Sequence, residues 1–153
     1  MKKKTLKQLK SELKKGPSWQ MPDDEAIEHE YKYEYKNHHS QYGFKDLDHF
    51  RKSVHNAKIL HVTPEVDKKI GYRSHTSSFD DLHNLIKGYA SYPKFRNEKT
   101  LRELSDRIKE GKPTNYPMLL KWPDGRLTIM GGNTRADLSM QHHGHYDALI
   151  LEK

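Results

Sequence analysis

A chain of 153 residues is long enough for one domain with a hydrophobic core and too short for two domains of typical size. It contains no cysteine, which excludes disulfides, thiolate metal sites and cysteine catalysis. The formal charge of +7 favours polyanionic partners such as nucleic acid. No apolar run approaches the roughly 20 residues of a membrane helix, and no apolar stretch follows the charged start Met1–Lys4, so we expect a cytoplasmic protein without membrane contact or secretory signal.

Residues 1–43 are predicted to form a basic, polar N-terminal extension ahead of a domain at 44–153. Seven lysines lie between positions 2 and 15, where they form either a nucleic-acid-binding arm or a solvated basic surface. Within this arm, Thr5–Leu13 has a capping box and an apolar face, which predict a short helix. Further along, tyrosines at 31, 33 and 35 alternate with charged residues, which predicts a half-buried strand.

The domain begins with alternating helix and strand patterns. Apolar residues at helical spacing predict a helix over 44–55, and the apolar run 58–63 predicts a strand that ends at Pro64. Ser78 and Asp81 stand at capping spacing in front of a helix that extends to residue 89. This order of elements indicates an α/β fold.

The last third of the domain has the clearest signals. Thr100 and Glu103 form a capping box for a helix that ends at Gly111. Two strands joined by the turn Pro123-Asp124-Gly125 follow, since proline presets a negative φ and glycine accepts a positive one. The remaining predicted elements are strands at 117–122 and 126–130, a helix at 135–143 and a strand at 146–151.

The loop Gly131-Gly132-Asn133-Thr134-Arg135 lies between a predicted strand and a predicted helix. Glycines at such a junction let backbone N–H groups turn toward one point, and the helix adds the positive end of its dipole. Asn133 or Thr134 can cap the helix, and the Arg135 guanidinium can engage two phosphate oxygens. The pattern therefore predicts a phosphate site, and its alternative is a tight turn with a helix cap and a surface arginine.

The order of these motifs resembles the N-terminal domain of the ParB family, within the ParB/sulfiredoxin superfamily. The segments that carry the resemblance are Pro93–Arg96, the helix end Asp106–Gly111 and the loop Gly132–Arg135. Together they lie within about residues 90–151. The helix end departs from the family pattern, because Arg107 replaces a serine and one residue fewer precedes the glycine.

The resemblance implies an α/β (α+β) fold with a small mixed sheet and packed helices. It also implies a nucleotide, ATP or CTP, with Mg²⁺ as cofactors. Sulfiredoxin activity is excluded because the corresponding loop here has no cysteine. We expect no centromere-like recognition of DNA sequence, since no helix-turn-helix region follows within these 153 residues.

Phosphoryl transfer needs a carboxylate as base or metal ligand and cations for the developing charge. Glu98, near the start of the predicted helix, is our candidate carboxylate, and Asp137 is the next candidate; either carboxylate can instead complement a helix dipole. Arg96 is a further candidate for phosphate binding, and Lys94 and Arg73 are candidates for a nucleic-acid groove or plain surface charges. We expect no metal site at His142-His143-x-His145, because consecutive histidines on a helix diverge.

We therefore expect a nucleotide-binding phosphoryl-transfer enzyme, an NTP-dependent kinase or NTPase, connected with nucleic acid. One alternative is a non-enzymatic DNA- or protein-binding module of the same fold, and another is a metal-dependent nuclease that uses Glu98. The compact size, the basic N-terminus and the missing DNA-reading domain would suit an accessory protein of a phage or mobile element. For the fold, we expect one buried set: Leu101, Leu104, Ile108, Leu119, Leu127, Ile129, Leu149 and Leu151.

Overall fold

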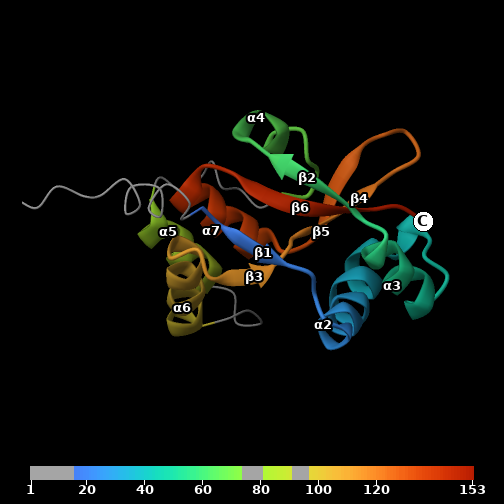
Figure 1. Cartoon of the computed structure of the whole chain (residues 1–153), viewed down its shortest axis with the longest axis horizontal. Helices are drawn as coiled ribbons and strands as arrows, with labels where there is room; N and C mark the ends of the chain where they lie inside the picture. The colour runs from blue at the N-terminus through green and yellow to red at the C-terminus, as the bar shows by residue number, and fades with distance from the viewer. Residues whose placement is uncertain (1–15, 74–80, 91–96) are drawn as a thin grey trace, which may run out of the picture.

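The computed structural model describes residues 16–73, 81–90 and 97–153, and it shows helices packed on a mixed sheet (Figure 1). The lysine arm and the helix predicted at Thr5–Leu13 lie outside these residues. In chain order the elements are β1 (Ser18–Gln20), α2 (Asp24–His29), the π-helix η1 (Glu30–His39), the 3₁₀ turn η2 (Ser40–Tyr42), α3 (Leu47–His55), β2 (Lys58–Val62), α4 (Pro64–Asp67), α5 (Leu82–Ala90), α6 (Glu98–Lys109), β3 (Pro113–Asn115), β4 (Met118–Lys121), β5 (Leu127–Gly131), α7 (Asn133–His143) and β6 (Tyr146–Leu151).

The main sheet has the strand order β2-β6-β4-β5. Strand β6 is parallel to β4 and antiparallel to β2, while β4 and β5 form an antiparallel hairpin. Strands β1 and β3 form a separate two-stranded parallel sheet. The prediction of a mixed α/β fold with a small mixed sheet and packed helices is therefore confirmed.

The two central strands are buried on both faces, which explains why their sequences are almost continuously apolar. Met118 and Leu120 of β4 pack with α2, η1 and α3 on one face, whereas Leu119 packs with Ala136 of α7 on the other. On the side of α7 that faces away from the sheet, helices α5 and α6 form a third apolar cluster around Leu138 (Figure 1). Helix α7 is thus enclosed between the sheet and two helices.

The residues predicted to be buried together are mostly buried, but they do not form one cluster. Helix α6 contributes Leu101 and Ile108 to the cluster with α5, while the strands divide their apolar residues between the two faces of the sheet. Leu104 and Leu127 are only partly buried. The prediction assumed that α6 covers the strands directly, and α7 lies between them.

The strand predicted at Tyr31–Tyr35 is wrong, because these residues lie in the π-helix η1. Helical spacing places Tyr31 and Tyr35 on one face, with ring centroids 5.4 Å apart and both side chains in the core. Tyr33 points away and is 57% exposed, whereas a strand would put all three on the same face. Residues 18–42 thus pack against the rest of the described chain.

Two predicted helix caps are also wrong. Helix α6 starts earlier than predicted, since the Asn97 side chain accepts the Thr100 N–H at 2.9 Å and serves as the N-cap. Neither Asn133 nor Thr134 caps α7; its N-cap is Gly132. For α5, the predicted cap residue Ser78 lies outside the described residues, and the Asp81 carboxylate accepts the Asn84 N–H at 2.8 Å at the start of the helix.

The β4–β5 hairpin turns at the predicted tripeptide. Gly125 has a φ of 87°, and its N–H donates to the Trp122 carbonyl at 2.8 Å. This hairpin leads from β5 into the glycine loop and then into α7.

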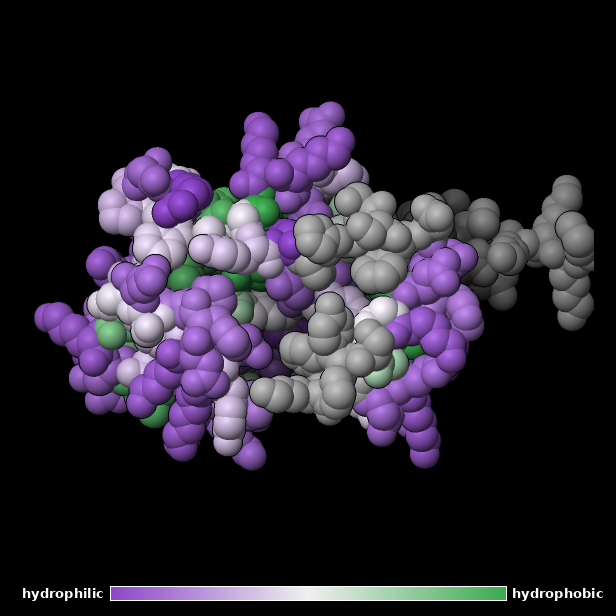
Figure 2. All heavy atoms as spheres, turned by 180° about the vertical axis from the view of Figure 1, so that it is seen from behind, coloured by the Kyte–Doolittle hydropathy of each residue, from purple (hydrophilic) through white to green (hydrophobic). Residues whose placement is uncertain are grey.

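The face of the molecule seen from behind the view of Figure 1 is mostly hydrophilic in its described side chains, which agrees with the high share of charged residues (Figure 2).

Candidate functional site

The predicted phosphate loop is the junction of β5 and α7. Gly131 ends the strand, and Gly132, with a φ of 93°, turns the chain into the helix. The first intrahelical hydrogen bond runs from the Ala136 N–H to the Gly132 carbonyl at 2.9 Å. In the part of the chain that the structure describes, no side chain caps this helix start. A helix start of this kind is a common anion site, because first-turn N–H groups and the positive end of the helix dipole favour negative charge.

Both glycines are closely surrounded, and at Gly132 the contact with the Pro117 backbone leaves no room for a side chain. A Cβ atom on Gly132 would lie 2.7 Å from the Pro117 Cα and 2.9 Å from the Arg135 Nη2. A Cβ atom on Gly131 would overlap the carboxylate of Glu30, the first residue of η1. The backbone of the loop is therefore bordered by Pro117, by a guanidinium and by a carboxylate.

Arg135 folds back over the start of its own helix. Its side chain is 13% exposed, and Nη2 lies 3.5 Å from the Tyr116 carbonyl and 3.8 Å from the Glu30 carboxylate. Both contacts are longer than the 2.7–2.9 Å typical of a charge-assisted hydrogen bond. The loop thus combines a helix N-terminus, a half-buried guanidinium and a carboxylate from a distant part of the chain.

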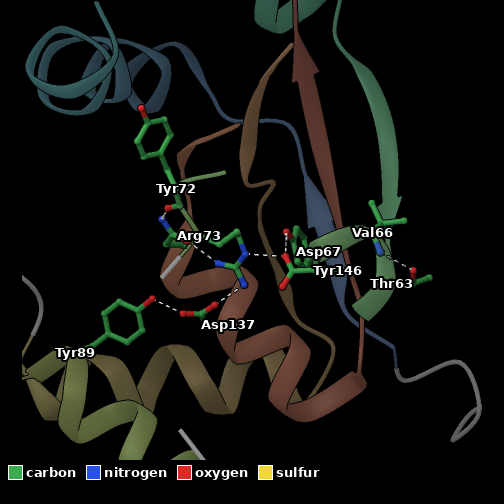
Figure 3. A network of polar contacts seen from close by, with 9 residues as sticks. Thr63, Val66, Asp67, Tyr72, Arg73, Tyr89, Asp137 and Tyr146 are labelled. Atoms are coloured by element: carbon green, nitrogen blue, oxygen red, sulfur yellow. Dashed lines mark hydrogen bonds and ion pairs between the residues drawn. The ribbon is translucent and has the colours of Figure 1, made fainter. Parts of the chain in front are cut away.

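A second polar cluster, centred on Arg73, is drawn in Figure 3, and it adjoins the loop through Asn133. The Asn133 side chain donates to the Tyr72 carbonyl at 3.2 Å and accepts from Arg73 Nη1 at 2.6 Å. Arg73 also donates from Nη2 to Asp137 at 2.5 Å and from Nε to Asp67 at 2.7 Å. One guanidinium therefore joins α4, the segment before residue 74, and two positions one turn apart on α7.

Tyrosine hydroxyls complete this cluster. Tyr146 of β6 donates to Asp67 at 2.6 Å, and Tyr89 of α5 donates to Asp137. The Arg73 guanidinium also lies over the Tyr146 ring, 5.4 Å from its centroid. Five elements or segments thus meet at one buried charge cluster, which fixes their relative positions.

Burial and charge shift the pKa values in this cluster. Burial alone would lower the pKa of Arg73, but the Asp137 and Asp67 carboxylates outweigh it and hold that pKa above its ordinary value. Burial raises the pKa of the Tyr146 hydroxyl far above its usual range, and the Arg73 charge opposes this only in part. The guanidinium stays charged and the phenol stays neutral at physiological pH.

The structure brings together only some of the predicted site residues. Gly131 to Arg135 form one loop, whereas Glu98, on the first turn of α6, pairs with Lys87 at 3.0 Å and with Arg102 at 2.9 Å. Hydrogen bonds from Lys87 and Arg102 lower the pKa of Glu98. Lys94 and Arg96 lie outside the described residues. Asp137, with a side chain 0% exposed, is bound by Arg73.

Arg73 was a candidate for a nucleic-acid groove or a plain surface charge, and its guanidinium is instead turned inward, with 7% of the side chain exposed. Sequence reasoning missed Glu30, the carboxylate that borders Gly131. No local pattern marks Glu30, because it precedes a tyrosine repeat that suggests a strand. Only the packing of η1 against β5 brings it to the loop.

The histidines near the C-terminus make separate contacts. His142 Nε2 lies 2.7 Å from the Ser105 Oγ, His143 Nε2 lies 2.8 Å from the Ile108 carbonyl, and the His145 ring packs beside His61. Burial, and then the neighbouring His143, lowers the pKa of His142. Across residues 16–73, 81–90 and 97–153, no three acidic or histidine side chains are grouped to hold a metal ion.

The chain matches no protein-family model, no curated protein and no solved structure. Among the described residues, no helix is both long and apolar enough to cross a membrane.

Proposed function

We propose that the loop Gly131–Arg135 binds the phosphates of a nucleotide and that the chain is a phosphoryl-transfer or nucleotide-hydrolysing enzyme of ParB/sulfiredoxin type. The expected nucleotide is ATP or CTP, and the expected setting is nucleic acid. The observation that carries the proposal is the start of α7: Gly132 turns the chain into a helix that no described side chain caps, and Arg135 folds back beside it.

The chemistry of this arrangement is electrostatic. Backbone N–H groups at the helix start bind phosphate oxygens, and a planar guanidinium can bind two oxygens at once. The Arg135 guanidinium lies beside the start of its own helix, near the Tyr116 carbonyl and the Glu30 carboxylate, so a phosphate bound at that helix start would lie within its reach. Arg135 would then neutralise charge that develops during transfer.

Glu30 is the carboxylate that the structure places against this loop, so we assign to it the role first expected of Glu98. It would orient the attacking hydroxyl or water and accept its proton. Mg²⁺ commonly binds through substrate phosphates and one or two carboxylates, and a single carboxylate at the loop fits that pattern. Bound there, Mg²⁺ would shield the negative charge of the triphosphate.

One observation favours the non-enzymatic alternative. The Glu30 carboxylate already lies near the Arg135 guanidinium, at 3.8 Å, and an ion pair between them would neutralise the loop without a ligand. In that case the loop is a structural turn within a DNA- or protein-binding module. The two functions differ in whether the wild-type chain binds nucleotide at all.

The test is calorimetric titration of wild type and Arg135→Ala with ATP, CTP, GTP and UTP, with and without Mg²⁺. Loss of a charge-assisted hydrogen bond, about 1.5–3 kcal/mol, should weaken binding about ten- to a hundredfold. Arg126→Ala is the matched control, because Arg126 is an exposed arginine on the β4–β5 turn. Absence of nucleotide binding by wild type would favour the non-enzymatic module.

Measurements of turnover distinguish Glu30 from Glu98 as the catalytic carboxylate. Glu30→Gln should reduce nucleotide hydrolysis or transfer about a hundredfold while affinity stays within a few-fold. Glu98→Gln should leave turnover near wild type, and the opposite result would return the catalytic role to Glu98. Cleavage of DNA by wild type with Mg²⁺, without nucleotide turnover, would instead support the nuclease.

A further inference from the structure

Tyr72 has an unusual backbone conformation. Its φ is 62°, and within the described ranges it is the only residue other than glycine with a positive φ. Bulky side chains rarely adopt this region, because Cβ approaches the backbone too closely. Such strain persists only where the surroundings enforce it, and it is common at ligand sites.

The neighbouring residues fix this conformation on both sides. Before Tyr72, Gly71 bridges to β5: its N–H donates to the Leu127 carbonyl at 2.9 Å, and its carbonyl accepts from the Ile129 N–H at 2.9 Å. After Tyr72, the buried Arg73 is held by Asp67 and Asp137. The Tyr72 carbonyl itself accepts a hydrogen bond from the Asn133 side chain.

The result is an aromatic ring directed outward. Tyr72 is 71% exposed, and its ring points away from the buried Arg73 cluster (Figure 3). It meets the His39 ring of η1 nearly edge to face, with centroids 5.9 Å apart. Burial of apolar surface therefore does not account for a strained tyrosine here. The ring is presented to solvent from a fixed backbone, one hydrogen bond from the first residue of α7.

We propose that Tyr72 is the stacking platform for the base of the nucleotide whose phosphates bind the Gly131–Arg135 loop. The inference rests on the proposed function of that loop. An exposed aromatic face attracts a planar base, and stacking tolerates different bases because each has a π-face. The Asn133–Tyr72 hydrogen bond holds the Tyr72 backbone beside the helix start, so a ligand as long as a nucleoside triphosphate could reach the loop with one end and the ring with the other.

The experiment compares ligands with and without a base. ATP and inorganic tripolyphosphate are titrated into wild type, Tyr72→Ala and Tyr72→Phe in the presence of Mg²⁺. Tyr72→Ala should weaken ATP binding about five- to a hundredfold and leave tripolyphosphate binding unchanged. Tyr72→Phe should bind ATP like wild type, because the ring and not the hydroxyl stacks. Tyr33→Ala, which removes another exposed tyrosine, is the control and should bind both ligands normally.

The outcomes separate the platform from the phosphate loop. Equal losses for ATP and tripolyphosphate in Tyr72→Ala would overturn the platform and make Tyr72 a support of the loop. No loss for either ligand, with Arg135→Ala still impaired, would overturn the platform and leave the proposed function standing. If wild type binds neither ligand, the proposed function fails, and the platform fails with it.

Discussion

Replacement of Arg73 by methionine is the most informative perturbation of the fold. Methionine keeps an unbranched apolar stem and removes the guanidinium, which makes three hydrogen bonds of 2.5–2.7 Å to Asp67, Asn133 and Asp137. Asp137 is 0% exposed, so the variant leaves a carboxylate in the interior without its cationic partner. Breaking a buried pair in this way costs about 3–5 kcal/mol.

Urea denaturation measures that loss. A domain of this size is stable by about 5–15 kcal/mol, so Arg73→Met removes a large fraction of the total. With an m-value of about 2 kcal/mol per M, the midpoint should fall by about 1.5–2.5 M at constant m. The matched control is Arg102→Met, because Arg102 pairs on the surface with Glu98 and its loss should leave the midpoint nearly unchanged.

A double variant sharpens the result. Asp137→Asn in the Arg73→Met background removes the buried carboxylate charge as well, so the double variant should be less destabilised than the sum of the single variants. A loss below about 1 kcal/mol in Arg73→Met would refute the reasoning, since it would mean that water reaches the pair and screens it.

Two further predictions concern the loop and the buried phenol. Gly132→Ala should destabilise the fold by about 1–3 kcal/mol more than Gly125→Ala in urea denaturation, because both glycines have a positive φ but only the first meets the Pro117 backbone; equal losses would contradict that contact. Stability should fall by about 1.4 kcal/mol per pH unit above about pH 10 through Tyr146, whose raised folded-state pKa lets only the unfolded chain ionise there. The stability difference between wild type and Tyr146→Phe should therefore shrink from pH 9 to pH 11, and a constant difference would contradict the shift.

Local signals in the sequence predicted the elements that local chemistry determines. The turn at Gly125 follows from one residue's tolerance of positive φ, and the apolar run of β4 follows from burial on both faces. The loop at Gly131 was predicted at the correct junction for the same reason. Each of these features needs only residues within a few positions of one another.

Features that depend on tertiary packing were not predictable. Tyr31, Tyr33 and Tyr35 satisfy the alternation of a strand. They form a helix because packing against the apolar face of the sheet buries two of them, Tyr31 and Tyr35, on one side of that helix. Glu30 comes to Gly131 across about a hundred residues of chain, so no spacing rule relates the two. No pattern in the sequence near Arg73 indicates that its side chain is buried between the carboxylates of Asp67 and Asp137.

The buried cluster and the loop Gly131–Arg135 are mechanically linked through α7. Asn133 and Asp137 are four residues apart and share one face of the helix, so the single Arg73 guanidinium fixes the rotation of α7 about its axis. Arg135 is two residues from Asn133, about 200° around the helix, and therefore points to the opposite side, toward Tyr116 and Glu30. Loss of the Arg73 hydrogen bonds would free α7 to rotate and would move Arg135, although Arg73 itself would not contact a bound nucleotide. A loss of nucleotide affinity in Arg73→Met would thus identify a positioning residue, whereas only a loss in Arg135→Ala at unchanged stability would place a side chain on the phosphate.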